Sequence, residues 1–142
     1  MLYKNPILFY SLFILLLFVK PTFPEVRNIS SDDLKSRLYD DINVVDIRTE
    51  VEWEETGTIP GSYLLTFFDE AGNYDKISWF QSFEKIIPES NSVIIVCRSG
   101  RRSAFLARLL TKELDEKLVY NLNGGILDWL DNSFETETFQ KN

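Results

Sequence analysis

Residues 92–103 read SVIIVCRSGRRS, and this stretch decides the fold. Residues 92–96 form a continuous, mostly β-branched apolar run, which is typical of a strand buried on both faces of a parallel sheet. Cys97 follows the run directly, and apolar residues then recur at helical spacing over residues 104–114. The stretch therefore predicts a strand, a short loop and a helix. Its thiol stands at the carboxyl end of the strand, where open α/β sheets bind their ligands.

Further strands and helices are expected around this unit. The predicted helices are one begun at Ser30 by a capping box with Asp33 and running to Tyr39, and one that packs Ile77, Phe80, Phe83 and Ile87 into the core. The other predicted strands cover residues 43–47, 63–65 and 118–122. Because strands alternate with helices, the fold class is α/β, with a mostly parallel central sheet and helices on both faces.

Composition limits the possible functions. The 142-residue chain has the length of one domain, and its apolar content of 44% is enough for a packed core. The formal charge of −7 argues against a nucleic-acid binder, which needs a basic face. The absence of histidine excludes Ser-His-Asp triads and most zinc sites. Since Cys97 is the only cysteine, it is a buried small side chain, an intermolecular link or a nucleophile.

Residues 1–24 differ from the rest of the chain in hydropathy. Lys4 precedes an apolar run, residues 7–19, in which Ser11 is the one polar residue; its helical length of about 20 Å is short against a hydrocarbon core of about 30 Å. The pattern predicts an export signal, and hence a periplasmic or secreted protein. No small-residue cleavage site follows the run, so an uncleaved anchor that tethers the protein to the membrane is the alternative. Residues 25–133 form the domain, and residues 134–142 form a polar tail that we expect to fray.

The loop after the strand carries the candidate chemistry. Its successive backbone N–H groups and the N-terminus of the next helix favour an anion and favour the thiolate of Cys97. Gly100 permits the positive φ that a tight cradle needs. Cys97 is therefore the candidate nucleophile, and the candidate substrate-binding residues are Arg98, Ser99, Gly100, Arg101, Arg102 and Ser103. The alternative for the arginines is a solvated helix face, above all for Arg101.

Several short blocks together resemble the signature of the rhodanese family, in its usual order, over residues 42–132. The blocks are Asp46-Ile47-Arg48, Glu52-Trp53, GTIPGS at 57–62, the loop from Cys97 to Arg102, and GGILDW at 124–129. The resemblance implies a small α/β domain whose loop cysteine accepts sulfane sulfur as a persulfide and passes it to an acceptor. It implies no metal and no organic cofactor. It also places Asp46 and Arg48 near the loop, where we expect a supporting ion pair.

One position departs from the family pattern, because Thr58 stands where histidine is common. Thr58 lies outside the loop, so we expect the change to affect only the hydrogen bonding of its turn. Trp53 and Trp129 are expected to be core residues, and Gly124-Gly125 a turn and not a phosphate loop, since no Gly-x-Gly-x-x-Gly pattern accompanies it.

The resemblance implies a sulfurtransferase that takes sulfur from thiosulfate, or a similar small sulfur-containing anion, and gives it to a thiol or to cyanide. A persulfide carrier that serves a partner protein is the main alternative. A phosphatase is less favoured, although cell-cycle phosphatases share the fold. Their loops place arginine after five intervening residues, whereas here that position is Ser103 and Arg102 comes after four.

Overall fold

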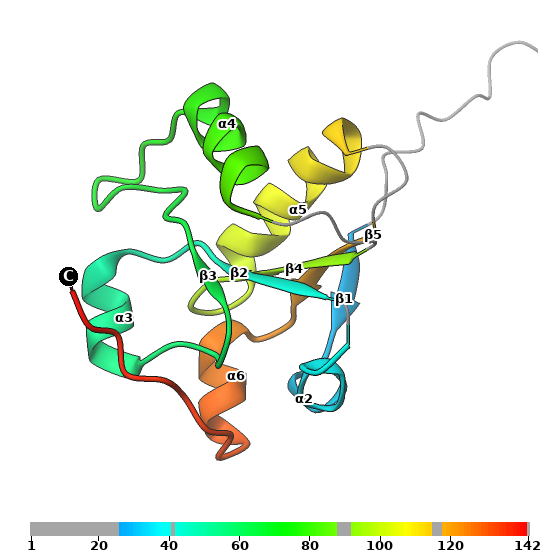
Figure 1. The fold of residues 1–142 in the computed structure, drawn as a ribbon, viewed down its shortest axis with the longest axis vertical. Coiled ribbons are helices and arrows are strands. Elements are labelled where there is room, and N and C mark those ends of the chain that lie inside the picture. The colour runs from blue at the N-terminus through cyan, green and yellow to red at the C-terminus, as the bar shows by residue number, and fades with distance from the viewer. Residues whose placement is uncertain (1–25, 41, 88–91, 115–117, 142) are drawn as a thin grey trace, which may run out of the picture.

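The computed structural model describes residues 26–40, 42–87, 92–114 and 118–141. Five parallel strands form one sheet in the order β1-β5-β4-β2-β3, and helices cover both of its faces (Figure 1). The elements are, in chain order, β1 Arg27–Ile29, α2 Ser31–Arg37, β2 Asn43–Asp46, α3 Glu50–Thr56, β3 Tyr63–Leu64, α4 Lys76–Ile86, β4 Ser92–Val96, α5 Arg101–Glu113, β5 Leu118–Leu122 and α6 Gly125–Asp131. The predicted α/β class is confirmed.

Strand β4 lies in the middle of the sheet and supplies side chains to both faces. Because side chains alternate along a strand, Val93, Ile95 and Cys97 face α4 and α5, whereas Ile94 and Val96 face α2 and α6. All five of these residues are buried. The expectation of a strand buried on both sides is confirmed, and the thiol stands at its carboxyl end.

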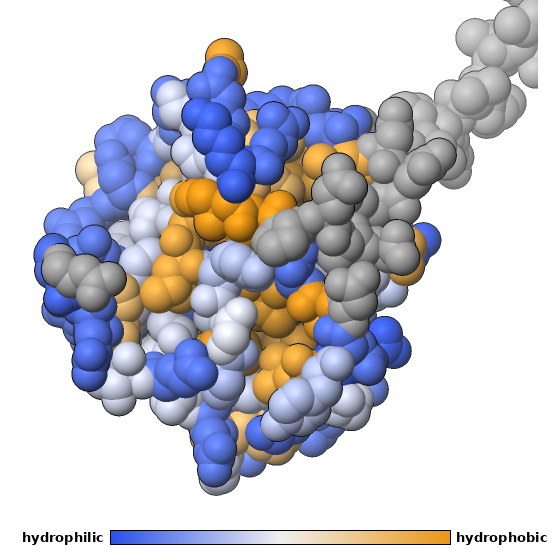
Figure 2. Space-filling model, viewed as in Figure 1, coloured by the Kyte–Doolittle hydropathy of each residue, from blue (hydrophilic) through white to orange (hydrophobic). Residues whose placement is uncertain are grey.

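Three of the four residues predicted to pack α4 into the core do so, since Phe83 and Ile87 are buried and Phe80 packs against the same cluster, and Ile77 is the exception. Ile77 was expected in the core but is 72% exposed, while the buried residues of this helix are Trp79 and Phe83. Asp75 caps the helix, which places Ile77 in the first turn, and the Trp79 indole N–H donates to the Leu65 carbonyl at 3.1 Å. Figure 2 shows apolar surface gathered beneath α4, within hydrophilic surroundings.

Three elements escaped the sequence analysis: β1, α3 and α6. Strand β1 has three residues, of which two are exposed, so it has no apolar pattern to detect. Helix α3 begins with a capping box formed by Thr49 and Glu52. Helix α6 begins at Gly125, with Gly124 as its N-cap, whereas the sequence analysis predicted only a turn at these two glycines. Trp53 and Trp129 are both buried, as predicted.

The C-terminal tail is docked through residue 141, and the expectation that it frays is wrong. Glu137 exchanges two backbone hydrogen bonds with Thr58, at 2.8 and 2.9 Å. Phe139 packs its ring against Trp53, with ring centroids 5.3 Å apart, and Lys141 pairs with Glu50 on α3. The backbone of Thr58 therefore holds the tail against the protein, which supports a structural role for this position.

The predicted export segment, including the apolar run at residues 7–19, lies outside the described residues and stays a prediction. Among the residues that the structure describes, no helix is both long enough and apolar enough to span a membrane.

Candidate active site

The sulfur of Cys97 faces the backbone of its own loop. Gly100 begins α5 with a φ of 84°, and its N–H donates to Cys97 Sγ at 3.1 Å. The hydroxyl oxygen of Ser103, one turn into the helix, lies 3.1 Å from the same sulfur. The helix N-terminus adds its positive end to these contacts. The loop thus presents polar hydrogens to whatever negative charge the sulfur carries.

Cys97 is completely buried, in the cluster that also holds Val45, Ile95 and Leu106. Cys97 is therefore both a packed core side chain and a candidate nucleophile, since its side chain lies in the core and its sulfur faces the loop. A reagent that reacts with Sγ must displace part of its surroundings. The adjacent Arg98 side chain is half-exposed, whereas the strand that precedes Cys97 is paired within the sheet.

A chain of polar side chains runs from the buried sulfur across the sheet to the exposed Asn28 on β1. Ser103 Oγ lies 2.6 Å from Asn121 Oδ1, and the Asn121 side-chain amide donates to Asn28 Oδ1 at 2.9 Å. Ser103 and Asn121 are both buried. The single hydroxyl hydrogen of Ser103 can serve either Asn121 or Cys97, so this chain couples the sulfur to β5 and β1. Sequence analysis missed Asn121 and Asn28, which lie far from the loop along the chain.

The three arginines of the loop have different partners. Arg102 makes a bidentate pair with Glu52 of α3, through N···O distances of 2.9 and 2.5 Å. Arg98 lies 3.7 Å from Glu55, and both of these side chains are more than half exposed. Arg101 is exposed and has no ion-pair partner among the described residues. The loop is therefore less positive than its sequence alone indicates, because two glutamates neutralise two of its arginines.

The Glu52–Arg102 pair is ionised over a wide pH range. Partial burial opposes the charge on Glu52, but hydrogen bonds from Arg102 and from the Thr49 N–H outweigh it and hold the pKa of Glu52 below its ordinary value of 4.5. The same hydrogen bond is the largest influence on Arg102 and raises the pKa of its guanidinium, with a smaller contribution from Cys97. Neither Glu52 nor Glu55 was singled out in the sequence as a neighbour of the loop.

Asp46 and Arg48 form the supporting ion pair that was predicted. Their closest N···O distance is 2.7 Å, and both side chains are only 1% exposed. Arg48 also donates to the Gly57 carbonyl at 2.8 Å and to Thr56 Oγ1 at 2.6 Å, at the end of α3. One guanidinium thus joins the end of β2 to the helix that carries Glu52.

Gly124 and Gly125 bring the start of α6 against the loop. The N–H of Ile126 donates to the Cys97 carbonyl at 2.9 Å, and the N–H of Leu127 donates to the Arg98 carbonyl at 3.2 Å. A Cβ at Gly125, where φ is 63°, would stand 2.4 Å from the Cys97 carbonyl oxygen. This pair of glycines therefore helps to hold the loop in place. The sequence analysis predicted a turn here but not this contact with the loop.

A shallow hollow of about 390 Å³ adjoins the loop and is lined by Phe68, Ser99, Arg101, Arg102 and Phe105. No group of three or more His, Cys, Asp or Glu side chains that could hold a metal ion exists within the described ranges. The polar groups around Cys97 are thus backbone N–H groups, hydroxyls and guanidinium groups, which suit a reaction on a small anion.

Comparison with known proteins agrees with this geometry. The profile described as "Rhodanese-like domain" matches residues 30–132. The chain belongs to the rhodanese-like domain family. It is 34% identical over 106 residues to a protein of Allochromatium vinosum named "Sulfurtransferase", a match that covers 73% of this chain and 88% of that protein. The resemblance expected from the short sequence blocks is confirmed.

A second sequence relative and one solved structure also resemble this chain. It is 27% identical over 106 residues to YrkF of Bacillus subtilis, which is named as a candidate sulfur carrier protein; the match covers 73% of this chain but only about half (51%) of YrkF. The thiosulfate sulfurtransferase of Pseudomonas aeruginosa shares the fold, with a TM-score of 0.65 and 20% identity, over 82% of this chain and 20% of that one. The Pseudomonas structure shows the shared fold, and a place among sulfur-transfer proteins follows from the family match and the Allochromatium relative.

The contact of Gly125 with the loop predicts a large effect of a single methyl group. Gly125→Ala should lower the free energy of unfolding by about 2–4 kcal/mol, because the new Cβ would overlap two backbone carbonyls that cannot move independently. Gly61→Ala is the matched control, since Gly61 also has a positive φ, of 73°, but nothing within 4 Å of its Cβ position. It should cost only about 1 kcal/mol. Equal losses in urea unfolding for the two variants would contradict the close packing of α6 on the loop.

The Glu52–Arg102 pair predicts a pH-dependent stability. Because the folded-state pKa of Glu52 is lowered, its contribution is present above pH 4.5 and is lost as the pH falls through the lower folded-state value. Glu52→Gln should therefore lower the free energy of unfolding by about 1 kcal/mol at pH 7. At pH 3 the difference between the variant and the wild type should be smaller. Urea unfolding at both pH values checks this, and a difference that grows toward acid pH would refute it.

Proposed function

We propose that this rhodanese-like domain is a sulfurtransferase that takes sulfane sulfur from thiosulfate or a similar donor and passes it, through a Cys97 persulfide, to a thiol or to cyanide. The observation that carries the proposal is the contact of Cys97 Sγ with the N–H of Gly100, at the positive end of α5. Both the N–H directed at the sulfur and the positive end of the helix would interact favourably with negative charge that forms on the sulfur during the reaction.

In the first half of the proposed cycle, the Cys97 thiolate attacks the outer sulfur of thiosulfate. A new S–S bond forms on Cys97, the S–S bond of thiosulfate breaks, and sulfite leaves with the electron pair. The loop N–H groups face the negative charge on the persulfide. Arg98 is more accessible to the donor than Arg102, because its pair with Glu55 is long and exposed, whereas Arg102 is held by two hydrogen bonds to Glu52.

In the second half, an external thiolate or cyanide attacks the outer sulfur of the persulfide. The S–S bond to Cys97 breaks, Cys97 leaves as a thiolate, and the acceptor carries the sulfur away. The acceptor must come from outside, because the chain has no second cysteine. The cycle therefore predicts ping-pong kinetics. Export to a periplasmic or extracellular space, proposed from residues 1–24, would place the reaction outside the cytoplasm.

A persulfide carrier for a partner protein is the second candidate. Two observations favour it: the similarity to YrkF, and the aromatic side chains of Phe68 and Phe105 beside the loop. A carrier would load with sulfur but turn over slowly with small acceptors. A phosphatase is disfavoured, because the position after five intervening residues is Ser103, which is buried in a hydrogen-bonded chain and brings no positive charge.

The proposed function predicts a gain of one sulfur atom on Cys97. The intact mass of the full chain should rise by about 32 Da after incubation with thiosulfate, and cyanide should reverse the increase. Cys97→Ser should show no increase, because its hydroxyl cannot form the persulfide. Ser36→Ala, which changes an exposed residue of α2 outside the loop, is the folded control and should still load. An unchanged wild-type mass, with the protein folded and the thiol reduced, would overturn the proposal.

A further inference from the structure

The hollow beside the loop has an apolar wall that sulfur transfer from thiosulfate does not use. Phe68, which follows β3, and Phe105 on α5 line it, with their ring centroids 5.8 Å apart. Phe105 is 37% exposed, although burial of an aromatic ring is normally favourable. Thiosulfate and sulfite carry no apolar surface, so neither would gain free energy by contact with these rings. A ligand that covers the rings must have an apolar part.

The charged groups of the hollow define one end of its ligand. Two guanidinium groups line it, but Arg102 is already neutralised by Glu52. Arg101 is exposed and has no acidic partner in the described part of the chain. A carboxylate at Arg101 would therefore gain an ion pair without breaking one. The hollow thus combines an apolar wall with one available positive charge.

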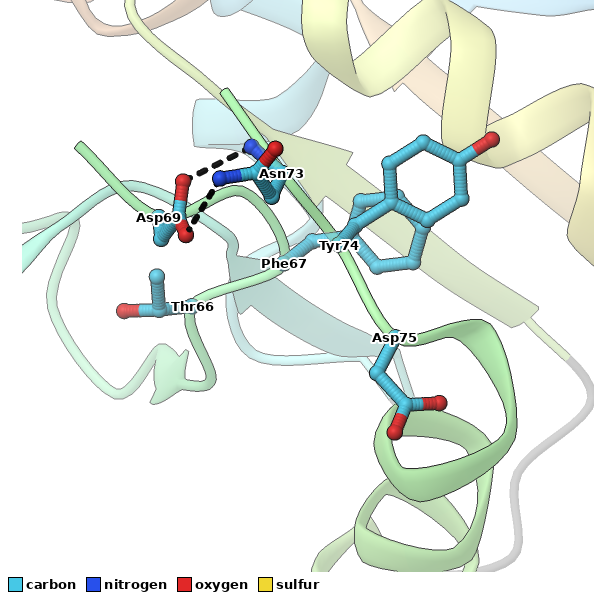
Figure 3. A pocket seen from close by; sticks show the side chains of 6 residues that line it. All are labelled: Thr66, Phe67, Asp69, Asn73, Tyr74 and Asp75. Carbon is cyan, nitrogen blue, oxygen red and sulfur yellow. Dashed lines mark hydrogen bonds between the residues drawn. The ribbon is translucent and has the colours of Figure 1, made fainter. Parts of the chain in front are cut away.

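A second hollow on the same aromatic cluster is acidic. The ring of Tyr74 stacks on Phe67 at 4.9 Å and lies 5.7 Å from Phe105, and Asp69 and Asp75 line this second hollow together with the rings of Phe67 and Tyr74 (Figure 3). Hydrogen bonds from Asn73 lower the pKa of Asp69, and hydrogen bonds from Ser78 lower the pKa of Asp75, so both are charged at neutral pH. An anionic ligand that covered the rings would therefore direct its charged end toward Arg101 and away from these carboxylates.

We propose that the hollow binds the sulfur acceptor, and that this acceptor is an organic thiol with an apolar body and a carboxylate at its other end. The inference rests on the proposed function and names its acceptor class. The body would lie on Phe68 and Phe105, and the carboxylate would pair with Arg101. The thiolate would attack the outer sulfur of the Cys97 persulfide, Cys97 would leave as a thiolate, and the acceptor would depart as a persulfide.

The test measures sulfur transfer from the loaded protein to three thiols. The full chain is first loaded with thiosulfate, and loading is verified by mass. Transfer is then timed with mercaptoacetate, with 6-mercaptohexanoate, which has the same charge and a longer apolar body, and with 6-mercaptohexanol, which has that body without the charge. The second-order rate constant should be on the order of tenfold higher for 6-mercaptohexanoate than for mercaptoacetate. It should be about fivefold higher than for 6-mercaptohexanol.

Matched variants test which residues cause the preference for the longer apolar body and the preference for the carboxylate. Phe105→Ala should remove most of the preference for the longer body, whereas Leu127→Ala, which truncates a residue of similar exposure on α6, should retain it. Arg101→Gln should remove the preference for the carboxylate over the alcohol. Arg108→Gln, which deletes the same charge from an exposed position farther along α5, should not.

The outcomes separate this inference from the function on which it rests. If the protein does not load, sulfur transfer itself fails, and the acceptor site falls with it. If the protein loads but transfers sulfur equally well to all three thiols, the acceptor site alone is refuted. The same holds if the preferences survive in Phe105→Ala and Arg101→Gln.

Discussion

The geometry of the candidate active site depends above all on the buried guanidinium of Arg48. It pairs with Asp46 at the end of β2 and donates to Thr56 and Gly57 at the end of α3. Because charge without a partner is costly inside a protein, this group leaves α3 few alternative positions. Helix α3 in turn presents Glu52 to Arg102, at the start of α5. The Asp46–Arg48 pair, for which we propose no chemical role, thus helps to position α3 between the carboxyl end of β2 and the loop.

The loop is held from the other side by the start of α6. Two N–H groups of α6 donate to the carbonyls of Cys97 and Arg98, and the absence of a side chain at Gly125 makes this approach possible. The N–H of Gly100 remains directed at the sulfur. The carbonyls of the loop therefore face outward to α6 while an N–H faces inward, which is the arrangement that an anionic sulfur needs. Because Cys97 is completely buried, access to its sulfur depends on the side chains around it.

Sequence analysis predicted the parts of this site that are local in the chain. The run at residues 92–96, the thiol after it and the helix that follows form one continuous unit, so their pattern is sufficient. It did not find Glu52, Asn121 or the contacts of α6, because these reach the loop from other elements. It also missed β1, which is too short to show a pattern, and the docked tail, whose contacts with Trp53 and Thr58 depend on tertiary structure. The arginines were counted as positive charge, whereas two of them pair with glutamates.

The central claim is that the loop is already arranged, before reaction, to hold a charged sulfur on Cys97. Crystal structures of the full chain before and after reaction with thiosulfate would test it most directly. We predict one added sulfur atom on Cys97 that accepts hydrogen bonds from loop N–H groups, with the backbone from Cys97 to Ser103 unchanged within coordinate error. A loop that refolds around the added sulfur, or a sulfur that points away from every loop N–H group, would contradict the account.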